Sequence, residues 1–214
     1  MKLRMHRFVI GALATAATTL TGVAMAGTSG MDVPPTVEIS SLHLSGSACP
    51  AGTAYVELSE DLQSFVVIYD EFHASAGPGV PLQESVKSCT ATINLSFPAG
   101  WSWTVSSVAY SGSAQMDSSV TGRFSSKLSF PGQLPVSREV RLPGPTLTGG
   151  QDFDLVGDYT ISNWSPCGRI RPMTALATVQ VDNSANRRRA GVIRVSQQTG
   201  EFQMVFNIDW RRCY

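Results

Sequence analysis

The chain has few charged residues, and after Ala26 it has no long hydrophobic run. Charged side chains make up only 15% of the 214 residues, and the 16 basic residues are matched by 16 acidic ones. Because the segment from Met1 to Ala26 holds three basic residues and no acid, the remaining chain is acidic by three charges. This balance argues against a polyanion-binding protein or a highly charged disordered chain. We therefore expect no nucleic-acid partner.

The sequence also lacks the short motifs of common catalytic and metal sites. It contains no Gly-x-Ser-x-Gly nucleophile elbow, no glycine-rich phosphate loop and no Cys-x-x-Cys pair. No pair of carboxylates is marked by its spacing for glycoside hydrolysis. We expect no cofactor and no metal, and the absences favour a protein without catalytic activity.

The segment from Met1 to Ala26 has the pattern of a secretory signal peptide. Basic residues precede an apolar run from Phe8 to about Leu20, and Ala24-Met25-Ala26 supplies the small-x-small pattern before Gly27. Threonines interrupt the run and no stop-transfer sequence follows, so a retained membrane anchor is the weaker interpretation. We expect a secreted product, or a periplasmic one in a host with an outer membrane, with no membrane attachment after cleavage.

The length that remains after cleavage fits one domain. We expect residues 1–26 to form the signal peptide, residues 27–36 a flexible mature N-terminus and residues 37–214 a single domain. We further expect this domain to be a monomer.

All four cysteines, Cys49, Cys89, Cys167 and Cys213, lie in the exported part of the chain. An even number of cysteines in an oxidising compartment indicates two disulfide bonds. Three connectivities are open. We favour Cys49 with Cys89 and Cys167 with Cys213, because each pair closes a loop of about 40 to 46 residues, worth roughly 3 to 4 kcal/mol in the loop-entropy model. A zinc site is disfavoured by the long spacings and by histidines distant from the cysteines.

Alternation of apolar and polar residues dominates the rest of the chain. Apolar residues occupy every second position from Cys89 to Phe97, and again from Phe202 to Trp210. In the segment from Trp101 to Tyr110 the apolar phase shifts by one residue, which predicts a β-bulge near Ser106 and Ser107. About ten short strands separated by glycine and proline turns predict an all-β fold, a disulfide-stapled antiparallel β-sandwich that is jelly-roll-like or immunoglobulin-like. The weaker strands are expected at 37–44, 55–58, 65–72, 101–110, 138–142, 173–181 and 192–195.

Several short patterns occur in a characteristic order along the exported chain. They are Gly46-Ser47-Ala48-Cys49-Pro50, Ala76-Gly77-Pro78-Gly79 with Lys87-Ser88-Cys89, Phe97-Pro98-Ala99-Gly100-Trp101, Trp164-Ser165-Pro166-Cys167-Gly168 and Trp210-Arg211-Arg212-Cys213. In this order they resemble the secreted family known as domain of unknown function 4360, from about Val37 to Cys213. The resemblance implies small, β-rich extracellular proteins with four cysteines. It implies no activity, ligand or catalytic residue.

Two pairs of residues are candidates for a ligand-binding site. Trp101 and Trp103 are two positions apart, so on a strand they share a face and would form an aromatic platform for sugar rings. Packing in the core is the competing interpretation, because Val105 continues the same face. Glu71 and His73 lie at the end of the expected strand 65–72, where they would share one strand face. This places an acid and a base close together. A solvated strand end explains this pair equally well.

Two charged segments are further candidates. Asp152, Asp154 and Asp158 with Gly157 suggest a calcium-binding loop, although the spacing departs from the helix-loop-helix pattern. An exposed acidic loop is the simpler interpretation. The run Arg187–Arg189 is expected at the tip of a hairpin, where it would contact an anionic surface or polysaccharide, or be a solvated turn.

These observations favour a secreted binding or structural module, with an extracellular glycan or protein as its partner. Two alternatives remain open on the sequence: a secreted hydrolase or metal-dependent enzyme, and an inhibitor or effector that presents a rigid loop. The sequence does not identify the ligand.

Overall fold

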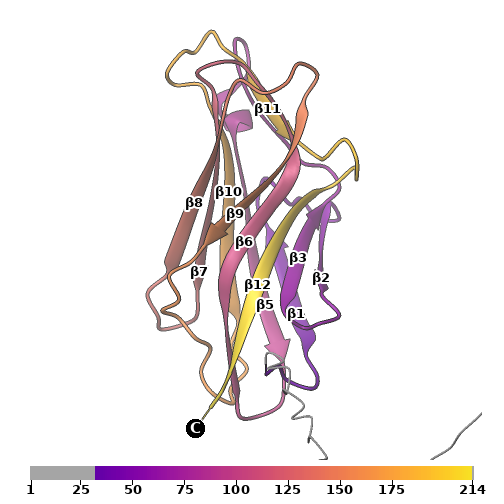
Figure 1. The fold of residues 1–214 in the computed structure, drawn as a ribbon, viewed down its shortest axis with the longest axis vertical. Helices are drawn as coiled ribbons and strands as arrows, with labels where there is room; N and C mark the ends of the chain where they lie inside the picture. The colour runs from indigo at the N-terminus through magenta and orange to yellow at the C-terminus, as the bar shows by residue number, and fades with distance from the viewer. Residues whose placement is uncertain (1–31, 214) are drawn as a thin grey trace, which may run out of the picture. The chain divides into compact units, whose positions relative to one another are not determined.

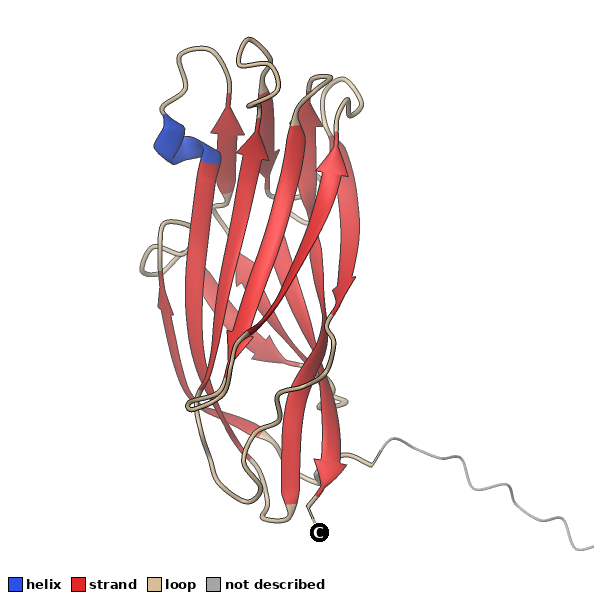
Figure 2. Cartoon of the chain, turned by 90° about the vertical axis from the view of Figure 1, so that its left-hand side faces the viewer, coloured by secondary structure: helices blue, strands red, loops and turns tan. Residues whose placement is uncertain are grey.

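The computed structural model describes residues 32–213, which consist almost entirely of antiparallel strands. Twelve strands form two sheets, and the one other regular element of this part of the chain is the short 3-10 helix η1 (Leu82–Ser85). Figures 1 and 2 show the two layers of strands facing each other. The all-β sandwich predicted from the alternation is therefore confirmed. The expected signal peptide, residues 1–26, lies outside the described residues.

The first sheet has five strands, each antiparallel to its neighbours. Its strand order is β1 (Glu38–Ser45), β5 (Val86–Ser96), β10 (Met173–Asp182), β7 (Thr121–Ser129) and β8 (Val136–Pro143). Polar and apolar residues alternate along β5 and β10, so serine and threonine face outward while the apolar side chains face the second sheet.

The second sheet has seven strands, and its long strand β6 (Trp101–Met116) is its centre. One side of β6 pairs with β12 and, farther along, with β11; the other side pairs with β9. Beyond β12 lie β3 and then β2, and beyond β11 lies β4. The bounds of these strands are β2 (Ala54–Leu58), β3 (Ser64–Tyr69), β4 (His73–Ala76), β9 (Gln151–Asp158), β11 (Gly191–Arg194) and β12 (Phe202–Arg212).

Aromatic side chains fill the space between the sheets. Phe202 stacks on Phe72 with ring centroids 4.2 Å apart, and Phe65 stacks on Phe206 at 4.9 Å. From the opposite sheet Phe124 reaches Tyr110, with centroids 5.3 Å apart. Rings at these separations contribute attraction beyond the area that they bury. These rings pack the two layers against each other, and the outer face of each sheet lies outside this core.

The predicted β-bulge is present in β6. Asn207 of β12 pairs with Ser107, and the next residue, Ile208, pairs with Val105, so Ser106 has no partner in this ladder. The extra residue explains why the apolar phase shifts by one position in the sequence. The Ser106 hydroxyl instead donates a hydrogen bond of 2.8 Å to Asp209.

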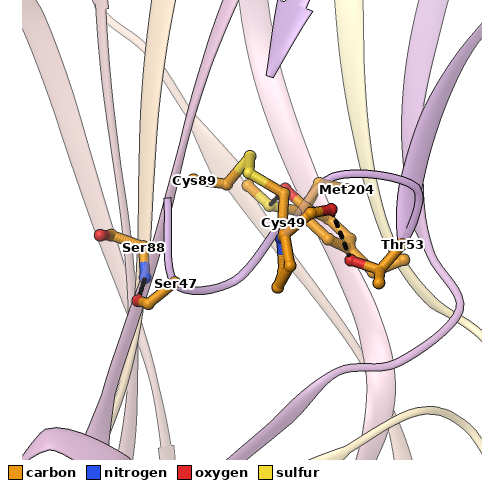
Figure 3. The surroundings of a disulfide bond; sticks show 8 residues. Ser47, Cys49, Thr53, Ser88, Cys89 and Met204 are labelled. Carbon is orange, nitrogen blue, oxygen red and sulfur yellow. Dashed lines mark hydrogen bonds between the residues drawn. A yellow bond between two sulfur atoms is a disulfide. The ribbon is translucent and has the colours of Figure 1, made fainter. Parts of the chain in front are cut away.

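Both disulfide bonds favoured from the sequence are present. Cys49 is bonded to Cys89 and Cys167 to Cys213. The first bond joins the segment after β1 to β5 inside the core. Next to it, at the surface, the amide of Ser88 donates to the Ser47 hydroxyl at 3.1 Å (Figure 3). Its two cysteines are each 2% exposed. Cys167 of the second bond is exposed. The two bonds therefore close loops of similar length, but the first is buried in the core and the second is partly exposed to solvent.

Three expectations about strands are corrected. The expected strand 65–72 ends at Tyr69, and a bend at Asp70 separates it from β4. The acidic segment 152–158 is not a loop but the strand β9. The arginine run does not lie at the tip of a hairpin, because β10 and β11 belong to different sheets and their connection crosses from one layer to the other.

Residues 32–36 are the part of the expected N-terminal segment that the structure describes. Asp32 forms an ion pair with Arg212 of β12, with an N–O distance of 2.9 Å. Within residues 32–213, no helix has the length and the apolar character needed to cross a bilayer.

Candidate functional site

Trp101 and Trp103 do not form an exposed platform. Each is 1% exposed, so the prediction that they present a surface for sugar rings is wrong. Trp103 lies edge-on to Phe130, with ring centroids 5.2 Å apart. Trp101 lies edge-on to Trp210, and the guanidinium of Arg212 covers its ring at 3.9 Å. The competing interpretation holds, because other parts of the chain cover both side chains.

Glu71 and His73 do not share a strand face. Glu71 lies in the bend after β3, whereas His73 begins β4, where it pairs with Arg194 of β11. Both residues are exposed, and neither lines any of the cavities described below. No group of three or more histidine, cysteine or acidic side chains in residues 32–213 is placed to hold a metal ion. The structure therefore places this pair in neither of these cavities and in no cluster of metal-binding side chains within residues 32–213.

The acidic segment lies on an outer sheet face. Asp152, Asp154 and Asp158 occupy alternate positions of β9, so their side chains point away from the core while Phe153 points into it. A calcium loop needs several carboxylates that converge on one point, and a pleated strand spaces them along a line instead. The calcium interpretation is therefore wrong, and the same three residues form part of an extended surface.

A polar groove of about 380 Å³ opens on this outer face, at the junction of β6, β9 and β12. We call it the polar groove. Hydroxyl, amide and carboxylate groups line most of it. Its lining residues are Ser111, Gly112, Asp152, Phe153, Asp154, Ser196, Gln198, Thr199 and Gln203.

Asp152 holds one wall of the polar groove in place. Its carboxylate accepts hydrogen bonds from the Ser196 hydroxyl at 2.7 Å and from the amides of Gln197 and Gln198 at 3.1 and 3.3 Å. The amide of Gln197, followed by the Ser196 hydroxyl, lowers the pKa of Asp152 below its usual range. An ionised Asp152 therefore fastens the turn between β11 and β12 against β9.

Asp154 has the opposite character, although it lies two residues away on the same face of β9. It is exposed and pairs across the ladder with Ser111 of β6, which in turn pairs with Gln203 of β12. These three residues form a row of hydrogen-bonding groups across three adjacent strands. In the same register Ile68 of β3, which is apolar and buried, separates this row from Tyr55 of β2, and the five strands span about 19 Å at the usual spacing.

Asp152 is poorly suited to act as the general acid of glycoside hydrolysis. Glycoside hydrolysis needs one carboxylic acid whose pKa is raised, so that it can protonate the leaving group. The pKa of Asp152 is lowered, and its oxygens already accept three hydrogen bonds. The geometry provides fixed hydrogen-bond acceptors and donors, which suit binding.

An apolar row runs beside the polar one. Val156, Ala109, Val205 and Val66 pair in sequence across β9, β6, β12 and β3, and all four side chains lie on the outer face. Val156 is 61% exposed. A second polar row follows, in which the Asn207 amide donates to the Ser107 hydroxyl at 2.7 Å. The outer face therefore alternates polar, apolar and polar rows.

Sequence reasoning missed the residues of this face, although the signal was present. Positions 152–158 alternate acidic and apolar residues up to Leu155, which is the same period that identified the other strands. The three acidic residues suggested a calcium-binding loop instead. Ser111, Thr199 and Gln203 carry no motif, and only the register of the strands brings them together.

Solved structures with low similarity to the chain include two carbohydrate-binding modules. The first is TmCBM61 in complex with β-1,4-galactotriose, at 12% identity and a TM-score of 0.28, covering 82% of this chain and 91% of that one. The second is the family 11 module from Clostridium thermocellum in complex with a mixed-linked tetrasaccharide, at 8% identity and a TM-score of 0.24, covering 78% and 89%. TM-scores this low do not establish a common fold.

A curated relative matches over most of the chain. It is an uncharacterized secreted protein of Arthroderma benhamiae, 30% identical over 184 residues, which cover 84% of this chain and 73% of the relative. The model of the family described as domain of unknown function DUF4360 matches residues 35–213. The two disulfides and the β-rich fold agree with what the resemblance to this family implies. The chain belongs to the DUF4360 family.

Proposed function

We propose that the protein is a secreted, non-catalytic module that binds an extracellular glycan through the outer face of its seven-stranded sheet. The observation that carries this proposal is the polar groove, whose hydroxyl, amide and carboxylate groups gather at the junction of three strands. A sugar hydroxyl both donates and accepts hydrogen bonds, and carboxylate and amide oxygens with amide N–H groups satisfy both needs.

The alternation of rows on this face supports the same ligand class. A sugar ring has apolar C–H groups beside its hydroxyls, and the row from Val156 to Val66 lies beside the row from Asp154 to Gln203. A ligand that crosses the strands would therefore meet apolar and hydrogen-bonding groups side by side. Binding sites commonly combine apolar contact with a few fixed polar groups in this way.

The rigidity of the groove supports binding by a surface that is already formed. The turn between β11 and β12 is fastened by Asp152, and the Gln203 amide donates to Glu201 at 2.7 Å. Tyr55 of β2 contacts the same glutamate through its hydroxyl. Groups that are held in place before binding lose less conformational entropy when a ligand arrives.

Export fits the covalent structure. Disulfide bonds persist in oxidising compartments, and both bonds here are formed with ordinary Cα–Cα distances of 5.6 and 5.8 Å. We infer that the signal peptide, residues 1–26, is removed and that the mature chain begins at Gly27. N-terminal sequencing of the secreted protein is expected to give Gly27 as its first residue; retention of residues 1–26 would contradict export by cleavage.

The experiment that tests the function is a glycan-binding screen followed by replacement of one groove residue. Neutral oligosaccharides are titrated into the wild-type protein, and the best ligand is then titrated into the Asp154→Ala variant. Because Asp154 is exposed and its carboxylate makes no hydrogen bond or ion pair within residues 32–213, we expect affinity to fall about tenfold or more with no change in Tm.

The matched control is Glu38→Ala, which removes an exposed carboxylate from β1 in the opposite sheet. It is expected to leave affinity unchanged. Equal affinities of the wild-type protein and the Asp154→Ala variant would contradict the placement of the site. The absence of binding to any neutral glycan, together with capture of a secreted protein, would contradict the ligand class.

A further inference from the structure

The connection between β10 and β11 presents three consecutive arginines to solvent. Arg187, Arg188 and Arg189 are all exposed. This connection lies at the end of the sandwich where β11 and η1 are found, opposite the C-terminal end of β12 (Figures 1 and 2). We call this connection, residues 183–190, the arginine loop.

Internal hydrogen bonds hold the arginine loop in one conformation. The Asn183 amide donates to the carbonyls of Arg187 and Arg189 at 3.5 and 3.0 Å, and the amide of Arg188 donates to the side chain of Asn186 at 3.1 Å. The amide of Arg189 donates to the Asn186 carbonyl at 2.9 Å. The three guanidinium groups are therefore carried by an ordered backbone.

A cavity of about 240 Å³ lies between the arginine loop and the connection from β4 to β5. The two connections touch, because a Cβ added at Gly77 would lie 3.0 Å from the Cβ of Ala190. Val80, Pro81 and Leu82 form an apolar part of its wall, and Leu82 is 69% exposed. The lining residues are Ala76, Gly77, Val80, Pro81, Leu82, Ser85, Asn183 and Arg187.

The carboxylates near the arginine loop do not pair with its guanidinium groups. Glu84 forms an ion pair with Lys87 at 2.8 Å, and Asp182 forms one with Arg123 at 2.8 Å. Asp117 accepts the amide of Ala190 at 2.9 Å. No salt bridge among residues 32–213 involves the three arginines of the loop. The loop thus concentrates positive charge beside a cavity.

We propose that this cavity and the arginine loop bind the carboxylate groups of an acidic polysaccharide, a chain of uronic acid units. A guanidinium group binds a carboxylate through two parallel hydrogen bonds, and Arg187 reaches the cavity wall where one sugar unit would sit. Arg188 and Arg189 then face the carboxylates of the following units. The apolar side chains of Val80, Pro81 and Leu82 in the cavity wall would contact the C–H face of that sugar unit.

This site is separate from the polar groove. The groove is lined by carboxylates and disfavours an acidic chain, whereas the arginine loop disfavours a cationic one. The two sites lie on different elements, because the groove is built by β6, β9 and β12. Loss of binding at one site would therefore leave binding at the other intact.

The test uses polygalacturonate as the probe and the Arg187→Gln variant of the mature protein. At about 50 mM salt we expect the variant to bind the polymer about tenfold more weakly than the wild type, because one charge-assisted contact is lost. Further replacement of Arg188 and Arg189 by glutamine is expected to abolish binding. The affinity of the wild-type protein should fall as salt rises.

Two controls separate binding at this site from a general effect of charge. Arg169→Gln makes the same change of charge at an exposed position next to Gly168 and Cys167, in the other end region, and is expected to leave binding unchanged. Asp154→Ala is expected to keep full affinity for the polymer. The proposal is overturned if Arg169→Gln weakens binding as much as Arg187→Gln, if the wild type does not bind polygalacturonate, or if anionic phosphatidylserine vesicles bind and the polymer does not displace them.

Discussion

Replacing both Cys49 and Cys89 by alanine is expected to lower the free energy of unfolding by about 4 kcal/mol. The bond closes a segment with a sequence separation of 40 residues, and in the loop-entropy model a cross-link of this length restricts the unfolded chain by about that amount. For a domain of this size the loss corresponds to a decrease in Tm of about 8 to 16 °C. Urea unfolding followed by circular dichroism measures it.

The matched comparison is the Cys167→Ala and Cys213→Ala double variant. Its segment has a separation of 46 residues, so the entropic contribution is almost the same. Cys49 and Cys89 are buried in the core, however, so their replacement also removes sulfur atoms from close packing. We expect the first variant to be the less stable of the two. Equal losses would show that burial of the first bond adds nothing to its effect.

Truncating Phe202 to alanine is expected to cost about 3 to 5 kcal/mol. Phe202 is fully buried, stacks on Phe72 at 4.2 Å and lies edge-on to Tyr69 at 5.8 Å. Its ring also contacts Phe153, whose backbone carries the neighbouring acids of the polar groove. A cavity at this point removes contacts with β3, with β9 and with the segment between β3 and β4. The Tm of the variant is expected to lie well below that of the wild-type protein.

The neighbouring residue provides the control for Phe202. Gln203 points to the outer face from the next position of β12, so Gln203→Ala is expected to change stability by no more than about 0.5 kcal/mol. It should nevertheless weaken glycan binding, because its amide lines the polar groove. A stability loss at Gln203 comparable with that at Phe202 would contradict the assignment of the two faces of β12.

The layered fold follows from alternation that is visible in the sequence. Strands β5, β10 and β12 each place apolar residues at every second position over most of their length, and a pleated strand turns that period into one buried face. The bulge at Ser106 was predictable for the same reason, because a single extra residue must reverse the phase. Loop length favoured the observed pairing of the cysteines, but the sequence alone left three connectivities open.

The candidate site was not predictable in the same way. Asp154, Ser111 and Gln203 come from segments that are far apart in the sequence, and they meet because β9 and β12 both pair with β6 in one register. No local pattern specifies that register. The prediction that Trp101 and Trp103 are exposed failed for a related reason. A shared strand face does not show whether that face meets solvent, and here Arg212 covers Trp101 and Phe130 packs on Trp103.

Mapping a bound neutral oligosaccharide by NMR tests the central claim most directly. Backbone amide signals of the isotopically labelled protein are followed as the best ligand of the glycan screen is added. We expect the largest shifts at residues of β6, β9 and β12 whose side chains face outward, with Ser111, Asp154 and Gln203 at their centre. Shifts confined to the outer face of the five-stranded sheet, or no shift with any neutral glycan, would contradict the account.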